Sequence, residues 1–165
     1  VMELLRQGDA AGLEQLVADQ PAAVRFLQGR LWDPESEIRE GAARALGAAA
    51  AAHPDLGREV LRRALWALND ESATNGAYML PAIGEIGNRD PDLASPFVGP
   101  MTYYLWDEGL RPGSLRALCR IAETAPELIA PVRDRLGAIN DVRDTGEQAC
   151  LDHLLAVTRE GVDGE

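Results

Sequence analysis

The sequence predicts an all-α protein, organised as an α-solenoid of about four to five stacked helix pairs. Short motifs recur at intervals of 34 to 37 residues along the chain. Between these motifs, apolar residues are spaced three and four apart, which is the period of an amphipathic helix. No segment shows the sustained polar–apolar alternation of a half-buried strand. Amphipathic helix pairs repeated in series bury their apolar faces against their neighbours and so form a solenoid core.

Three markers that keep phase along the chain define the repeat. The first is an aspartate preceded by an apolar residue and by Trp or Asn, at Asp33, Asp70, Asp107 and Asp141. The second is a proline 19 to 21 residues later, at Pro54, Pro91 and Pro126. The third is an apolar residue of the first helix, at Leu46, Ile83, Leu118 and Leu154. The markers divide one domain, residues 1–165, into approximate units 1–30, 31–67, 68–104, 105–138 and 139–160.

Unit 31–67 illustrates how each unit predicts two helices. The apolar stripe of its first helix consists of Ile38, Ala42, Ala45, Leu46 and Ala49. That of its second helix consists of Leu56, Val60, Leu61, Ala64, Leu65 and Leu68. The step from His53 to Pro54 is expected to separate the helices, because a residue before proline is disfavoured in the helical region.

The later units repeat this pattern, with second-helix stripes through Phe97, Met101 and Leu105, and then through Leu128, Val132 and Leu136. The N-terminal stretch fits a degenerate unit with a break at Gln20–Pro21. Pro81 falls inside a predicted first helix. It predicts either a kink or a helix that begins late, with the proline in its first turn.

Residues 31–47 read Leu-Trp-Asp-Pro-Glu-Ser-Glu-Ile-Arg-Glu-Gly-Ala-Ala-Arg-Ala-Leu-Gly and resemble the HEAT repeat. They hold that pattern's Leu-x-Asp, apolar–Arg, Ala-Ala and Ala-Leu-Gly elements. Counted generously, the resemblance covers residues 31 to 158. The chain is also similar to bacterial HEAT-like, armadillo-type repeat proteins. It implies a right-handed stack whose second helices line a concave, partner-binding face. It implies no catalytic residues.

The charge balance argues against two classes of partner. The chain has 27 acidic and 16 basic residues, which gives a net charge of −11. Binding to nucleic acid or to an anionic membrane needs a cationic surface, so neither is expected. All basic residues are arginines, and a chain without lysine cannot hold a Gly-x-x-x-x-Gly-Lys phosphate loop.

The residues of catalysis and metal binding are scarce and badly spaced. Cys119 and Cys150 lack Cys-x-x-Cys spacing, and His53 and His153 have no second ligand three or four residues away. No serine lies in a Gly-x-Ser-x-Gly elbow. We therefore expect no enzyme activity, no metal and no cofactor. Two cysteines, no long apolar run and no signal-like start predict a cytoplasmic protein.

The repeated aspartates have two interpretations. An aspartate ahead of a helix accepts hydrogen bonds from its free N–H groups, so the Asp33–Pro34 step is expected to cap the helix that follows. The resemblance implies that Asp33, Asp107, Asp141 and Arg39 are structural anchors that bridge neighbouring repeats. The alternative is an acidic ladder that binds a cationic ligand.

The candidate contact residues come from two long loops, 69–76 and 107–113, and from nearby aromatics. In a solenoid these loops project on one edge, about one repeat apart. Tyr103 and Trp106 are expected to be partly exposed, because other residues already fill the buried stripe. The alternatives are neutral loop variation and packing beneath the loops. The candidates are Trp66, Asp70, Glu71, Asn75, Tyr78, Tyr103, Tyr104, Trp106, Glu108 and Arg111.

These features favour a non-catalytic scaffold or adaptor that binds a protein of basic or mixed charge through the loop edge and the concave face. The chain is expected to be a monomer or a weak homo-oligomer. The resemblance leaves two alternatives. One is a phycobilin-lyase-like protein that handles a cofactor or small ligand, and the other is a HEAT-like protein that acts on nucleic acid.

Overall fold

The computed structural model describes residues 1–69 and 76–160. Every regular element in this part of the chain is a helix, which confirms the all-α class. The α-solenoid arrangement and its right-handed twist stay predictions.

The described α-helices range in length from the 5 residues of α9 to the 17 of α4. The α-helices are α1 (Met2–Gln7), α2 (Ala10–Asp19), α3 (Ala23–Arg30), α4 (Ser36–Ala52), α5 (Pro54–Leu68), α6 (Leu80–Arg89), α7 (Pro91–Met101), α8 (Arg111–Ala122), α9 (Arg133–Gly137) and α10 (Thr145–Glu160). The 3₁₀ turns are η1 (Gly76–Met79), η2 (Thr102–Trp106), η3 (Pro126–Leu128) and η4 (Ala130–Val132).

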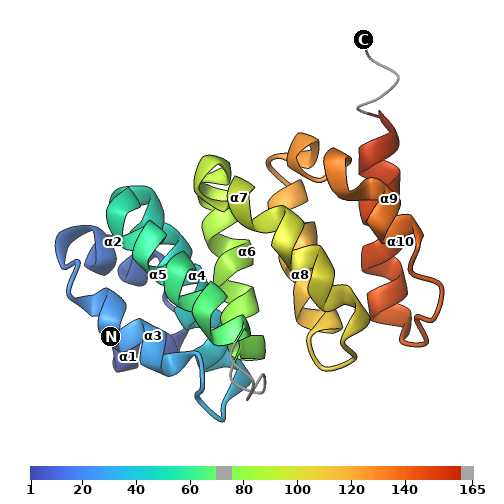
Figure 1. Ribbon diagram of the computed structural model, residues 1–165. Coiled ribbons are helices and arrows are strands. Elements are labelled where there is room, and N and C mark those ends of the chain that lie inside the picture. The colour runs from blue at the N-terminus through green and yellow to red at the C-terminus, as the bar shows by residue number, and fades with distance from the viewer. Residues whose placement is uncertain (70–75, 161–165) are drawn as a thin grey trace.

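The helices pack in chain order. The first helices of successive pairs contact one another in the series α2, α4, α6, α8, α10. The second helices α5 and α7 pack on the first helices of their own pairs, α4 and α6, whereas α3 packs mainly on α4 of the following pair. Figure 1 shows the chain advancing along this row from its N-terminal end to its C-terminal end. Each pair therefore contacts its neighbours in the row.

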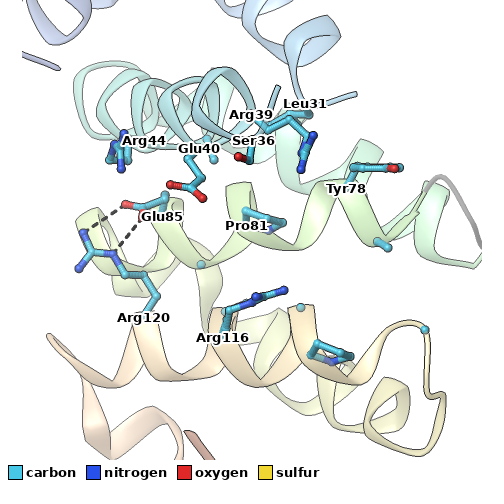
Figure 2. A pocket seen from close by; sticks show the side chains of 17 residues that line it. Leu31, Ser36, Arg39, Glu40, Arg44, Tyr78, Pro81, Glu85, Arg116 and Arg120 are labelled. Atoms are coloured by element: carbon cyan, nitrogen blue, oxygen red, sulfur yellow. Dashed lines mark hydrogen bonds and ion pairs between the residues drawn. The ribbon is translucent and has the colours of Figure 1, made fainter. Parts of the chain in front are cut away.

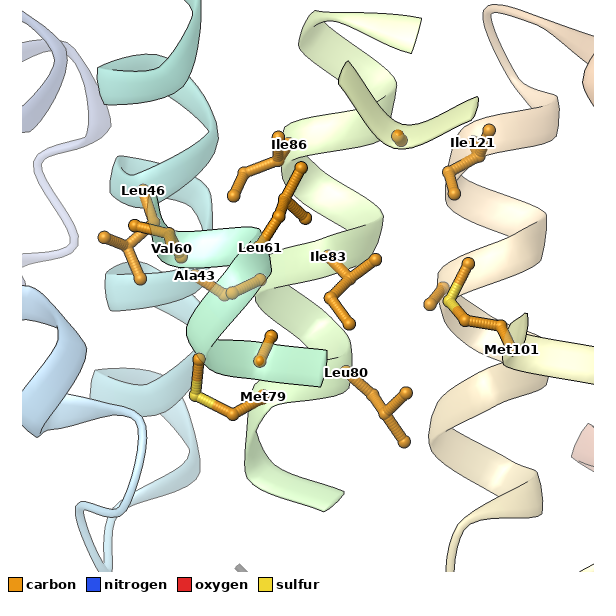
Figure 3. Packing of buried hydrophobic residues seen from close by; sticks show 14 of the residues in the cluster. Ala43, Leu46, Val60, Leu61, Met79, Leu80, Ile83, Ile86, Met101 and Ile121 are labelled. Carbon is orange, nitrogen blue, oxygen red and sulfur yellow. The ribbon is translucent and has the colours of Figure 1, made fainter. Parts of the chain in front are cut away.

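The hydrophobic core runs between the first and second helices (Figure 3). Leu46 of α4, Leu61 of α5 and Ile83 of α6 are fully buried there, and Met101 of α7 continues the core towards α8. Burying one such side chain contributes about 1.5 to 3 kcal/mol. The predicted first-helix stripe of unit 31–67 is buried at every position.

Two predicted boundaries are confirmed. Helix α4 ends at Ala52 and α5 begins at Pro54, with His53 between them in a non-helical conformation. Pro81 lies in the first turn of α6, so this helix begins late rather than kinking. A proline is tolerated there because the first turn has no internal acceptor for the missing N–H group.

The second helix predicted for unit 105–138 is wrong as a continuous element. It consists of η3, η4 and the short α9. Pro131 interrupts it, because a proline inside a helix removes a hydrogen bond and clashes with the preceding turn. Pro126 stands in the first turn of η3, where a proline is tolerated. At the other end of the chain, α1 was not predicted, and Gly8 ends it in the left-handed conformation with φ of 65°.

The prediction that Asp33 caps the next helix is also wrong. Helix α4 begins at Ser36, and Asp33 instead accepts a hydrogen bond from the Glu35 N–H at 3.2 Å. This is an Asx turn, in which the carboxylate bonds the backbone two residues on. Arg39 holds the same turn by donating to the carbonyls of Asp33 and Pro34, at 2.7 and 2.9 Å.

The loop predicted over 107–113 is shorter than expected, because η2 ends at Trp106 and α8 begins at Arg111. Asp107 closes the turn by accepting the N–H groups of Gly109 and Leu110, at 2.8 and 3.2 Å. Asp141 anchors the neighbouring unit, since its carboxylate lies 3.2 Å from the Arg111 guanidinium.

Candidate functional site

Large aromatic side chains are exposed to an unusual degree. Trp66 is 74% exposed, Tyr103 67% and Trp106 55%, while Tyr78 and Trp32 are each about two fifths exposed. The exposure expected of Tyr103 and Trp106 is therefore confirmed. Exposed Trp and Tyr side chains are enriched at the energetic centres of protein interfaces.

Three of these aromatics, Trp32, Trp66 and Tyr78, gather near a hollow between α3 and α5. We call these three side chains the aromatic edge. The hollow has a volume of about 650 Å³. The rings of Trp32 and Tyr78 lie 6.4 Å apart at 51°. The residues that line the hollow are Gln28, Gly29, Trp32, Arg63, Trp66, Ala67 and Met79.

Tyr104 ties the end of α5 to η2. It is half-buried, and its hydroxyl donates a hydrogen bond to the Asn69 side-chain oxygen at 3.3 Å. Burial raises the pKa of the Tyr104 phenol, against the opposing effect of the Asn69 hydrogen bond. Tyr104 therefore has a structural partner, and its hydroxyl stays protonated at neutral pH.

Tyr103 is held by the unit that follows. The guanidinium of Arg135 lies over its ring at 4.9 Å from the centroid, and Arg135 also donates to the Thr102 hydroxyl at 3.0 Å. In the repeat register Tyr103 corresponds to Trp66, 37 residues earlier. Trp66 has no such cation over its ring among the described residues.

The structure corrects one predicted contact residue. Arg111 is only 6% exposed, and its side chain donates to the Leu105 carbonyl at 2.6 Å and to Asp141. It is a structural bridge because its guanidinium supplies a buried carbonyl with a donor. Of the other candidates, Glu108 is exposed in the turn before α8. Asp70, Glu71 and Asn75 lie outside the described residues.

Trp32 was missing from the predicted contact set. The signal was available, because Trp32 and Trp106 occupy the same position of the repeat. The repeat register does not show that Trp32 contacts the ring of Tyr78, which belongs to the next unit.

A second hollow crosses the first helices α4, α6 and α8 and has a volume of about 730 Å³ (Figure 2). We call it the arginine trough. It is lined by Leu31, Ser36, Arg39, Glu40, Ala43, Arg44, Ala77, Tyr78, Pro81, Gly84, Glu85, Gly109, Pro112, Gly113, Arg116, Ala117 and Arg120. The resemblance implied that second helices line the binding face. The larger of these two hollows lies over the first helices instead.

The trough contains four arginines and two glutamates in a chain whose net charge is −11. Arg120 donates two hydrogen bonds to the Glu85 carboxylate, at 3.0 and 3.2 Å, and these bonds raise the pKa of the Arg120 guanidinium. Arg120 also contacts Glu123. Arg39 stacks over the Tyr78 ring at 5.8 Å while it holds the turn carbonyls. These two arginines are fixed by the fold.

Arg44 and Arg116 differ from that pair. Both are exposed, and neither makes an ion pair with any residue that the structure describes. Arg44, Pro81 and Arg116 each precede the third repeat marker by two residues, so they occupy one repeat position. Sequence reasoning missed this row, although the register contained it.

The cysteines and histidines bring no further site together. Within residues 1–69 and 76–160, no three His, Cys, Asp or Glu side chains are grouped closely enough to hold a metal ion. Cys119 lies against α10, with its sulfur 3.4 Å from the Cys150 carbonyl. Burial raises the pKa of the Cys119 thiol, so it is a poor nucleophile at neutral pH.

No described helix has the length and apolar character needed to cross a bilayer.

Comparison with known proteins gives no match to a family model, a curated protein or a solved structure. The two hollows are therefore the basis for a functional proposal.

Proposed function

We propose that this chain is a HEAT-like, non-catalytic binding module that holds a protein partner at the aromatic edge. The observation that carries the proposal is the exposure of Trp66 and Trp32 on either side of one hollow. An exposed tryptophan adds little to the fold, but it contributes strongly when a partner covers it.

The composition of the hollow supports a protein as the ligand. Trp32, Trp66 and Met79 give it an apolar wall, and Gln28 and Arg63 give it a polar rim. Arg63 is tied to Gln28 at 3.0 Å and to Glu59 at 2.9 Å, so the rim is already ordered. An apolar centre with a polar rim is the usual anatomy of a protein interface.

The test is capture of partners from a lysate of the source organism by immobilised wild-type and variant chains, with quantitative mass spectrometry as the readout. Trp66→Ala is the main variant. Phe26→Ala is the matched control, because Phe26 is an exposed aromatic on α3 outside the hollow. We expect one protein at near-stoichiometric yield with wild type and control, and a loss of about tenfold or more with Trp66→Ala.

Equal capture by Trp66→Ala and wild type would contradict the proposal. A bound mass of a few hundred daltons, detected by native mass spectrometry, would favour a small-ligand function instead.

A further inference from the structure

We infer that the arginine trough binds an extended acidic segment of a protein partner, and that Arg44 and Arg116 are its two charge contacts. This rests on the proposed protein-binding function and deepens it, because it names the chemistry of the partner on a second face. The trough is a local reversal of charge in an acidic chain, and acidic side chains complement it.

The distance between Arg44 and Arg116 determines how long a ligand must be to contact both. Arg44 comes from α4 and Arg116 from α8, and α6 with Pro81 and Gly84 forms the floor between them (Figure 2). Packed helices lie about 8 to 10 Å apart, so the axes of α4 and α8 are separated by about twice that distance. One small anion is too short to engage both walls along this span. An extended peptide of roughly five or six residues spans it at about 3.3 Å per residue.

The floor of the trough is low because small residues lie at the helix contacts. A Cβ atom on Gly84 would come within 2.9 Å of the Ala117 Cα, and one on Gly113 within 2.7 Å of the Leu80 side chain. The helices therefore approach closely, and no long side chain rises from these positions. An extended backbone can cross such a floor from α4 to α8, while acidic side chains on the side turned towards the floor reach Arg44 and Arg116 near its two ends.

The other charges in the trough are already assigned. Glu85 is neutralised by Arg120, and Arg39 is committed to the turn before α4. Glu40 is the remaining acid. It is exposed, lies one helical turn from Arg44, and makes no ion pair with a described residue. Its charge opposes an acidic ligand, so removing that charge is expected to strengthen binding.

A nucleic acid is the less favoured polyanion. Its phosphates would extend beyond the trough over a surface whose overall charge is strongly negative, and long-range repulsion would oppose the approach. A short acidic peptide keeps its charges within the trough. The trough also meets the aromatic edge, because Tyr78 lines the first and contacts Trp32 of the second. One partner can therefore engage both surfaces.

The test uses a fluorescein-labelled peptide of about ten residues with glutamate at alternate positions, which places the carboxylates on one side of an extended chain. Anisotropy titrations at low salt give Kd for wild type and variants. We expect the double variant Arg44→Gln/Arg116→Gln to weaken binding about tenfold. Glu40→Gln is expected to strengthen it about threefold.

The matched control is Arg25→Gln/Arg143→Gln, which removes the same charge from exposed arginines outside the trough. It is expected to change Kd by less than about twofold. Equal binding of a peptide with glutamine in place of glutamate would overturn the inference. So would equal weakening by the two double variants, or tighter binding of a single-stranded oligonucleotide of similar length.

The failure of this inference can be told from failure of the proposed function. Trp66→Ala is expected to leave peptide binding unchanged, because Trp66 does not line the trough. If Trp66→Ala abolishes partner capture while the trough variants bind the peptide like wild type, only the acidic-segment inference is wrong. If the peptide results hold and capture is insensitive to Trp66, the proposed function is wrong at the aromatic edge.

Discussion

The face built by the first helices differs from the face built by the second helices. Helices α2, α4, α6, α8 and α10 contact one another in an unbroken series. The second-helix row is less regular, since the second helix of unit 105–138 is broken into η3, η4 and α9. Helix α7 stays continuous although it contains Pro96 and Pro100. Close, regular packing gives a continuous floor with charges at its margins. The most exposed aromatic rings, Trp66 and Tyr103, lie on the second-helix side, in α5 and η2.

The largest effect is expected from a matched pair of leucine-to-alanine substitutions, one in each row of helices. Leu118 of α8 is fully buried in the first-helix row, and Leu128 of η3 is only partly buried. Leu118→Ala is expected to lower the free energy of unfolding by about 3 to 4 kcal/mol, and Leu128→Ala by about 1 to 2 kcal/mol, because the first leaves a larger cavity. Urea denaturation measures both. Equal losses would remove the distinction between the rows.

Glycine substitutions probe helix spacing directly. Gly84→Ala places a methyl group 2.9 Å from the Ala117 Cα, a backbone atom that cannot turn aside, so we expect a loss of about 2 kcal/mol. A Cβ atom added to Gly99 of α7 would lie in open space, so Gly99→Ala is expected to be neutral or stabilising by up to about 1 kcal/mol. The thermal unfolding midpoint should fall for Gly84→Ala and stay unchanged or rise for Gly99→Ala. A stable Gly84→Ala variant would show that α6 and α8 can separate.

The Arg111–Asp141 bridge tests how one unit is joined to the next. Arg111→Ala leaves the Leu105 carbonyl without its donor, and we expect it to cost about 1 to 2 kcal/mol. Asp141→Asn removes only a partly exposed charge and is expected to cost less than about 1 kcal/mol. The difference is measured by denaturation at low and high salt, where only the small Asp141 contribution should be screened. A larger effect at Asp141 would assign the bridge to charge rather than to the buried carbonyl.

The smallest effect is expected at the aromatic edge. Because Trp66 is mostly exposed, Trp66→Ala should change the free energy of unfolding by no more than about 0.5 kcal/mol. Circular dichroism during thermal unfolding checks this. A marked loss of stability would mean that Trp66 supports the fold, and its loss could then no longer be read as a binding effect.

Much of the local structure could be predicted from particular residues. The Ile38 to Ala49 stripe gave the buried face of α4, and the His53–Pro54 step gave the boundary with α5. The prolines later in the chain were read as markers between helices. Pro91 and Pro126 do begin helical elements, α7 and η3. A single stripe of apolar residues does not report that Pro96 and Pro100 leave α7 continuous while the helix around Pro131 is broken.

The candidate site was predicted less completely. Exposure of Tyr103 and Trp106 followed from the crowding of one helix face, but Arg111 was assigned to the surface when it is buried. Its partners, Leu105 and Asp141, lie on either side of it in sequence, and only packing brings all three together. The arginine trough was missed for a related reason, since its charges are dispersed among more numerous acids along the chain.

The sequence by itself determined the all-α class, the period of the repeat and the buried face of most helices, because these follow from the spacing of apolar residues and from backbone chemistry within a few residues. The tertiary structure decided which side chains from different units meet. Arg44 and Arg116 are 72 residues apart in the chain and share one trough only because α4, α6 and α8 pack side by side. Long-range placement of this kind depends on helix spacing, which small residues such as Gly84 set through contacts with other units.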